Sequence, residues 1–363
     1  MENTPTKTRR TRFVCISDTH NSTVKLPRGD VLIHAGDLTN TGSINELSKQ
    51  ISWLSKQDFE RKIVIAGNHD LTLDTDFYTQ HGAYHHNTNP QSPEDCQKLL
   101  TENTEILYLN HSGTTVTLTS LRGPRTTFTV FGSPYTPKMS TTTGDWAFQY
   151  SRGDLDAGRR IWQDIPLDTD VLITHGPART HRDEQYLRAN GSGGGPAGCE
   201  ALRQAMWRVR PRLAVCGHIH EGRGAERVTW DLDSTNVRFK EKTVESWVDP
   251  GQGNNKISLV DASRRSGRPL DNDGSSAVTG KHATSGPSVS SVADDAARPG
   301  IGVEGLARSP SSPRSDQPAL TGRQGRAETC IINCAIMSGS YPHRGPRRLM
   351  KPIVVDIDLP VRE

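Results

Sequence analysis

The chain of 363 residues lacks the features of a membrane or secreted protein. No apolar run approaches the roughly 18 residues that a membrane-spanning helix needs, and the polar, basic residues 1–12 hold no hydrophobic core for a signal peptide. The six cysteines form neither a CxxC pair nor the dense framework of a small disulfide-stabilised domain. We therefore expect an intracellular, cytoplasmic protein without a membrane partner.

The sequence is also poor in net charge and in hydrophobic residues. A formal net charge of +3 is too small to predict binding to nucleic acid. Hydrophobic residues make up 33% of the chain, and the deficit lies mostly in residues 262–327, which contain no aromatic side chain and many Ser, Gly, Pro and Arg. Such a segment cannot bury enough apolar surface to offset the entropy lost on ordering, so we predict that it is disordered.

What the chain does contain is a series of polar motifs, each just after a short apolar run that is typical of a buried strand. The runs are residues 13–16, 31–33, 63–66, 171–173 and 213–215, and the motifs after them are Asp18-Thr19-His20, Gly36-Asp37, Gly67-Asn68-His69-Asp70, His175-Gly176 and Gly217-His218-Ile219-His220. Residues two apart in an extended segment point to the same side, so His218 and His220 can direct two ligands into one cleft, as can Asp18 and His20. Carboxylate, amide and imidazole ligands without a thiolate suit Mn, Fe, Zn or Co.

Each motif by itself also fits a structural role. Asp37 after a strand can cap a turn, and Asn68-His69-Asp70 can form a polar turn. Five such motifs in one chain, each at a strand end, favour a shared metal site instead. His85-His86 lies near Tyr, Asn and Pro residues and is interpreted as an exposed connection.

The five motifs together resemble the D-x-H, G-D, G-N-H-[DE], H-G and G-H-x-H pattern of the calcineurin-like metallophosphoesterase superfamily. Longer strings at residues 33–39, 132–137 and 217–222 are similar to the branch that includes the metallophosphoesterase-domain brain proteins and their fungal relatives. The chain departs from the pattern at Asn40, where many members carry a second acid. That position is not a primary ligand, so the departure bears on the tuning of the site and not on metal binding.

The resemblance implies an α/β fold of four layers, an α/β/β/α sandwich, with a site for two divalent metal ions. The ligands that it implies are Asp18, His20 and His220 for one ion, Asn68, His175 and His218 for the second, and Asp37 as the bridge between both. His69 would be a catalytic residue over the substrate phosphate, with Asp70 as the candidate for fixing its orientation. The two ions would activate a bridging hydroxide for in-line attack on the phosphate.

The substrate that the resemblance implies is a small phosphodiester, such as a cyclic nucleotide. Two alternatives stay open: a phosphomonoesterase or protein phosphatase on the same site, and a non-enzymatic binding protein. All seven implied ligands and His69 are present, which argues against the binding protein. Trp146, Phe148 and Tyr150 are candidates for a wall that stacks a base, and equally for an aromatic core under a loop.

The positions of the motifs and of the apolar runs also predict how the chain is divided. We expect, in order, a flexible N-terminus at 1–11, the metallophosphoesterase domain at 12–261, the disordered insertion at 262–327 and strands completing the catalytic domain at 328–360. Helices are expected over residues 43–56, where Ser43 and Glu46 have the spacing of a capping box, and over residues 198–209.

Overall fold

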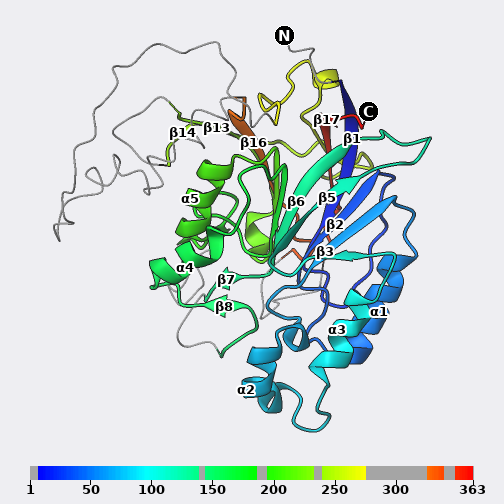
Figure 1. The fold of residues 1–363 in the computed structure, drawn as a ribbon, viewed down its shortest axis with the longest axis vertical. Helices are drawn as coiled ribbons and strands as arrows, with labels where there is room; N and C mark the ends of the chain where they lie inside the picture. Colours follow the sequence, from blue (N-terminus) through cyan, green and yellow to red (C-terminus); the bar gives the residue numbers. More distant parts are fainter. Residues whose placement is uncertain are drawn as a thin grey trace, which may run out of the picture.

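The computed structural model describes residues 7–138, 144–185, 194–232, 239–274, 325–338 and 348–362. Within these residues, two large β-sheets pack against each other and helices cover their outer faces (Figure 1). The part of the chain that is described has no helix both long and apolar enough to cross a membrane.

One sheet has six strands in the order β15-β17-β1-β2-β3-β4. Their bounds are Thr8–Ile16 for β1, Val31–Ala35 for β2, Arg61–Ile65 for β3, Leu107–Tyr108 for β4, Ser258–Asp261 for β15 and Ile353–Pro360 for β17. β1, β2 and β3 are parallel, whereas β17 pairs antiparallel with β1. The carboxyl ends of β1, β2 and β3 therefore lie at the same edge of this sheet.

The other sheet has seven strands in the order β14-β13-β16-β12-β9-β6-β5. Their bounds are Ser112–Thr117 for β5, Thr127–Ser133 for β6, Val171–Thr174 for β9, Leu213–Cys216 for β12, Gly224–Trp230 for β13, Glu241–Ser246 for β14 and Glu328–Asn333 for β16. β6, β9, β12 and β16 are parallel to one another. Two short pairs join β7 (Thr136–Pro137) to β8 (Gln149–Tyr150) and β10 (Glu184–Gln185) to β11 (Gly195–Pro196).

The main hydrophobic core lies between the two sheets, and alternation along the strands divides it from the outer layers. Phe13 and Cys15 of β1 belong to the core between the sheets, whereas Val14 and Ile16 pack under the helices α1 (Ile44–Ser55), α2 (Thr75–His85) and α3 (Pro93–Thr101). Helices α4 (Leu155–Trp162) and α5 (Glu200–Val209) cover the outer face of the seven-stranded sheet. The predicted four-layer α/β/β/α fold is confirmed.

Both predicted helices are present, and their ends follow from local sequence. The Ser43 side chain accepts a hydrogen bond from the backbone of Glu46, whose carboxylate in turn accepts one from the Ser43 backbone. This reciprocal capping box satisfies two donors that a helix start otherwise leaves open. At the start of α5, the Cys199 sulfur accepts a hydrogen bond from the backbone of Leu202.

Two segments of the chain are more ordered than composition predicts, the N-terminal one and the two margins of the predicted insertion. Strand β1 begins at Thr8, which pairs with Pro360. Residues 8–11, predicted to be flexible, therefore belong to the sheet. Residues 262–274 and 325–327, predicted to be disordered, are also folded: Ala262 is buried, and Asn272 forms a β-bridge with Arg326. The rest of the predicted insertion, residues 275–324, lies outside the described residues.

The C-terminal segment is central to both sheets. β17 lies between β15 and β1, and β16 lies between β13 and β12. Residues from beyond the predicted insertion thus supply one interior strand to each sheet, next to the strands whose ends carry the polar motifs.

Candidate metal centre

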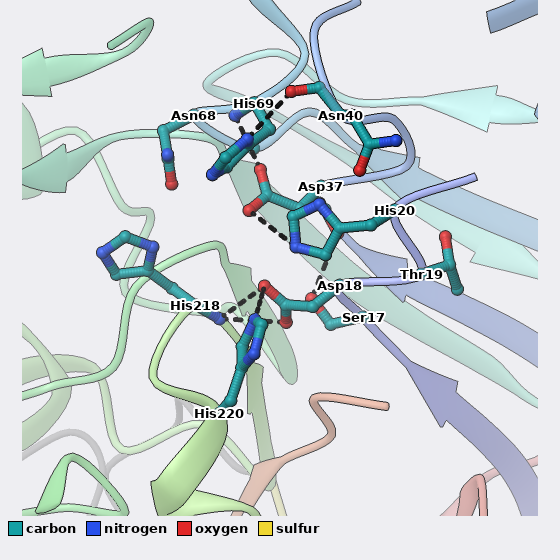
Figure 2. A network of polar contacts seen from close by, with 12 residues as sticks. Ser17, Asp18, Thr19, His20, Asp37, Asn40, Asn68, His69, His218 and His220 are labelled. Carbon is teal, nitrogen blue, oxygen red and sulfur yellow. Dashed lines mark hydrogen bonds and ion pairs between the residues drawn. The ribbon is translucent and has the colours of Figure 1, made fainter. Parts of the chain in front are cut away.

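The seven predicted ligands come together where strands of both sheets end. Asp18 and His20 follow β1, Asp37 follows β2 and Asn68 follows β3, while His175 follows β9 and the pair His218 and His220 follows β12. Figure 2 labels six of these side chains, those of Asp18, His20, Asp37, Asn68, His218 and His220, which converge from both sheets. Four of them lie on left-handed backbone, with φ of 56° at Asp18, 42° at His20, 53° at Asp37 and 64° at His218. Such conformations are uncommon for residues other than glycine and cluster at functional sites.

The ligands form two adjacent groups, with one carboxylate facing both. Donor atoms of Asp18, His20 and His220 lie within 4.8 Å of one another, as do those of Asp37, His175 and His218. The Asp37 Oδ2 atom is 3.4 Å from His175 Nε2 and 3.7 Å from His20 Nε2. Asp37 therefore stands between the groups, as a bridging ligand must.

Asn68 joins the second group through its amide oxygen. The Asn68 Oδ1 atom is 2.9 Å from His175 Nε2. The same histidine uses its other ring nitrogen, Nδ1, to contact the carbonyl oxygen of Ala35 at 2.9 Å. His20 is held alike, with Nδ1 3.1 Å from the carbonyl oxygen of Thr39. Such contacts fix the ring and direct Nε2 into the site, as is usual for metal-bound histidine.

The buried donors of the site fit divalent cations. The Nε2 atom of His218 is buried and has no hydrogen-bond partner among the described residues. Burial lowers the pKa of His218 to about 3 and that of His20 to about 4, so both imidazoles are neutral near pH 7. A buried nitrogen without a partner costs free energy unless something binds it. Neutral imidazoles beside carboxylates are the donor set that such ions use.

The two carboxylates keep their charge although they are buried. Burial raises the pKa of Asp18, but the hydrogen bond from His220 and the attraction of His220 and His175 together outweigh burial and bring the pKa to about 2. Burial acts likewise on Asp37, and there the attraction of His175 and His69 holds the pKa well below its usual range. The site thus holds two ionised carboxylates surrounded by imidazole nitrogens.

His69 lies beside the ligands and not among them. Its backbone N–H donates to Asp37 Oδ1 at 2.8 Å, and its Nδ1 is 2.9 Å from the carbonyl oxygen of Asn40. Its ring lies between those of His20 and Trp146, at centroid distances of 4.8 and 4.1 Å. Because Nδ1 is engaged, Nε2 is the nitrogen through which His69 can act on a substrate.

The structure corrects the expected role of Asp70. Its carboxylate accepts hydrogen bonds from the backbone of Gly67, Leu38 and Thr39 and from the Thr39 hydroxyl, at 2.7 to 3.2 Å. Asp70 therefore ties the loop after β2 to the loop after β3. The ring of His69 is oriented by a backbone carbonyl, that of Asn40, so the missing acid at that position leaves this contact intact.

The aromatic residues after Gly144 divide between the site and the core. The indole of Trp146 packs on His69, as a wall of the site would. Phe148 is 5% exposed within the core, and the Tyr150 hydroxyl accepts a hydrogen bond from Trp162 at 3.0 Å. His85, interpreted as part of an exposed connection, instead ends α2 half-buried, with its ring centroid 5.4 Å from that of Trp146.

A four-layer sandwich with two adjacent groups of carboxylate, amide and imidazole ligands at its strand ends is the architecture of a metal-dependent phosphoesterase. The family model of calcineurin-like phosphoesterases matches residues 11–222. The chain belongs to the calcineurin-like phosphoesterase family, as its motifs predict.

Named relatives match over a similar span. The chain is 40% identical over 221 residues to the human metallophosphoesterase domain-containing protein 1, covering 59% of this chain and 62% of that one. It is 36% identical over 233 residues to a UPF0046 protein of Caenorhabditis elegans, covering 61% of this chain and 54% of the relative. It is 45% identical over 223 residues to a protein of Emericella nidulans named probable rhamnogalacturonate lyase C, covering 61% of this chain. The match spans 18% of that protein, so its name is no argument for lyase activity here.

Proposed function

We propose that this protein is a phosphodiesterase that uses two divalent ions to hydrolyse a small phosphodiester, such as a cyclic nucleotide. The observation that carries the proposal is the position of Asp37, whose carboxylate lies 3.7 Å from a histidine of one ligand group and 3.4 Å from a histidine of the other. A shared carboxylate keeps two cations close enough to act on one phosphate.

Different residues of the chain would bind the two ions and act on the leaving group. Asp18, His20 and His220 would hold one ion, and Asn68, His175 and His218 the other, with Asp37 common to both. When bound, two divalent ions supply positive charge that activates water and neutralises the phosphoryl oxygens. His69, held through Nδ1 by the Asn40 carbonyl, presents Nε2 to the leaving oxygen and can donate a proton to it.

The surroundings of His69 favour a diester that carries an aromatic group. The Trp146 ring packs against His69 at 4.1 Å between ring centroids, so an aromatic surface adjoins the place where the leaving group would depart. An aromatic ring of a nucleotide base is a suitable partner for an indole face. The branch that the sequence resembles supports the same choice of a small phosphodiester.

A substrate panel tests the proposal. Purified protein loaded with Mn²⁺ would be assayed on 2′,3′- and 3′,5′-cyclic nucleotides, bis-p-nitrophenyl phosphate and p-nitrophenyl phosphate. We expect turnover of the diesters to exceed that of the monoester, and Asp37→Asn, which has nearly the same shape but no charge, to abolish it. A preference for p-nitrophenyl phosphate would indicate a phosphomonoesterase, and no turnover of any substrate would contradict an enzymatic function.

A further inference from the structure

We propose that Asn333, the last residue of β16, is a positioning residue that holds the turn carrying His218 and His220 in the geometry that metal binding needs. The inference rests on the proposed two-metal site. Asn333 lies beyond residues 11–222, the part of the chain that matches the family model. It comes from the strand that follows the predicted insertion.

Both the nitrogen and the oxygen of the Asn333 side-chain amide form hydrogen bonds with backbone groups near the ligands. The residue is completely buried. Its Nδ2 donates to the carbonyl oxygen of Ile219 at 2.8 Å and to that of Arg182 at 3.0 Å, and its Oδ1 accepts from the N–H of Ala335 at 3.1 Å. Because Ile219 lies between the two histidine ligands, this amide fixes the peptide on which both rings depend.

Arg182 forms hydrogen bonds with the backbone at the other end of the same turn. Its guanidinium donates from Nε to the carbonyl oxygen of Gly222 at 3.0 Å and from Nη2 to that of Arg223 at 2.8 Å. The 3-10 turn η2 (His220–Gly222) is therefore tied at its start to Asn333 and at its end to Arg182, whose own carbonyl Asn333 binds.

The segment after Asn333 joins the two strand ends that carry the first ligand group. The N–H of Cys334 donates to the carbonyl oxygen of Cys216 at 2.8 Å, and that of Ile336 donates to the carbonyl oxygen of Ser17 at 2.9 Å. Cys216 and Ser17 directly precede the loops that present His218 and Asp18. Residues 333–336 thus connect the end of β12 to the end of β1 across the two sheets.

Removing the Asn333 amide would take away the donor that binds the carbonyl oxygen of Arg182, and would leave the buried carbonyl of Ile219 with only the 3.0 Å bond from the Gly222 N–H. Loss of hydrogen bonds in a buried place costs free energy, so the turn would move to find other partners. Metal coordination tolerates only small displacements of its ligands, and loss of groups that orient ligands typically lowers metal affinity about 10- to 100-fold. We expect a fall of that size, although Asn333 contacts no ion itself.

The chain offers a closely matched control in Asn272. This residue is also buried, its Nδ2 donates to the carbonyl oxygens of Arg210 and Glu328 at 3.0 and 2.8 Å, and its Oδ1 accepts from the N–H of Gly274 at 3.1 Å. It therefore makes the same three kinds of bond, but at the start of β12 and β16. Five residue steps along β16, roughly 16 Å at the usual rise of a strand, separate the two positions.

The test compares Asn333→Ala and Asn272→Ala in the full chain. Mn²⁺ would be titrated calorimetrically into metal-free protein, and the melting temperature of each variant would be measured without metal. We expect both variants to melt at similarly reduced temperatures, Asn333→Ala to lose at least fivefold in Mn²⁺ affinity, and Asn272→Ala to bind within twofold of wild type. A smaller loss at Asn333→Ala, or an equal loss in both variants, would overturn the inference.

A second pair of variants and the metal binding of wild type distinguish the remaining outcomes. If Asn333→Ala does not fold, the same thresholds apply to the pair Asn333→Ser and Asn272→Ser, in which a hydroxyl keeps one donor. If wild-type protein binds no Mn²⁺, the proposed function and this inference fail together. If wild type binds two Mn²⁺ and Asn333 variants bind them equally well, the inference alone fails.

Discussion

The buried ion network around His181 predicts how stability depends on pH. His181 Nδ1 is 2.6 Å from a Glu226 oxygen, and its Nε2 is 3.1 Å from a Glu241 oxygen, while Arg203 also binds Glu241 at 2.7 Å. Burial lowers the pKa of His181, but the two carboxylates outweigh burial and raise the pKa to about 9. The side chain is 1% exposed, so solvent screens this shift little.

The magnitude follows from the difference between the folded and unfolded pKa values. A pKa of about 9 in the folded protein, against 6.5 unfolded, corresponds to about 3 kcal/mol at roughly 1.4 kcal/mol per pKa unit. Because the folded pKa is the higher one, this stabilisation is fully present below pH 6.5 and is lost as the pH rises through about 9. The lowered pKa of Glu241 describes part of the same interaction, so its contribution is not added again.

Urea unfolding of metal-free wild type and His181→Gln at a series of pH values measures this term. The difference between the two free energies of unfolding should be largest near pH 6 and should shrink by about 3 kcal/mol by pH 10. The pKa of His175 is also raised to about 9, because Asp37 outweighs its burial, so only the comparison with the variant isolates His181. A difference that stays constant from pH 6 to pH 10 would refute the reasoning.

Three further predictions concern the site, the predicted insertion and the strands that follow it. His69→Ala should keep full metal occupancy by elemental analysis while turnover of an alkyl diester falls roughly 10²- to 10⁴-fold, because a proton donor is lost; loss of one metal equivalent would contradict this role. Trp146→Ala should lower turnover on cyclic nucleotides more than Trp146→Phe does, since Phe keeps a ring against His69; equal activities in steady-state assays would remove the indole from the mechanism. Replacing residues 275–324 with a short Gly-Ser linker should preserve melting temperature and activity, whereas truncation after Asp261 should unfold the protein, because it removes β16 and β17 from the sheets; equal stability of the two proteins by circular dichroism would show that the C-terminal strands are dispensable.

The sequence by itself determined the strands that end at the site and the polar residues after them, which include the candidate ligands. These features are local: an apolar run predicts a buried strand, and side chains that follow parallel strands meet at one edge of a sheet. The capping box of Ser43 and Glu46 is equally local, and it starts α1 where the sequence predicts. Short-range patterns of side chains were sufficient for these parts.

Tertiary structure alone decided which groups orient the site. The Asn40 contact to His69 comes from a backbone carbonyl, which every residue has, so no sequence motif distinguishes it from the expected contact with Asp70. Asn333 donates a hydrogen bond to the Ile219 carbonyl, 114 positions away in the chain. A polar residue at the end of a strand does not by itself predict which backbone group it will bind. Trp146 and Phe148 are two residues apart, yet packing placed one beside His69 and the other in the core.

The segments wrongly predicted to be flexible or disordered show the same physical limit. Composition predicts disorder when a segment has too little apolar surface to bury. It contains no information about hydrogen bonds that the segment forms with strands elsewhere in the fold. Thr8 is ordered by pairing with Pro360, and Asn272 by carbonyls of Arg210 and Glu328. Partners so distant in sequence are brought within reach only when the two sheets assemble.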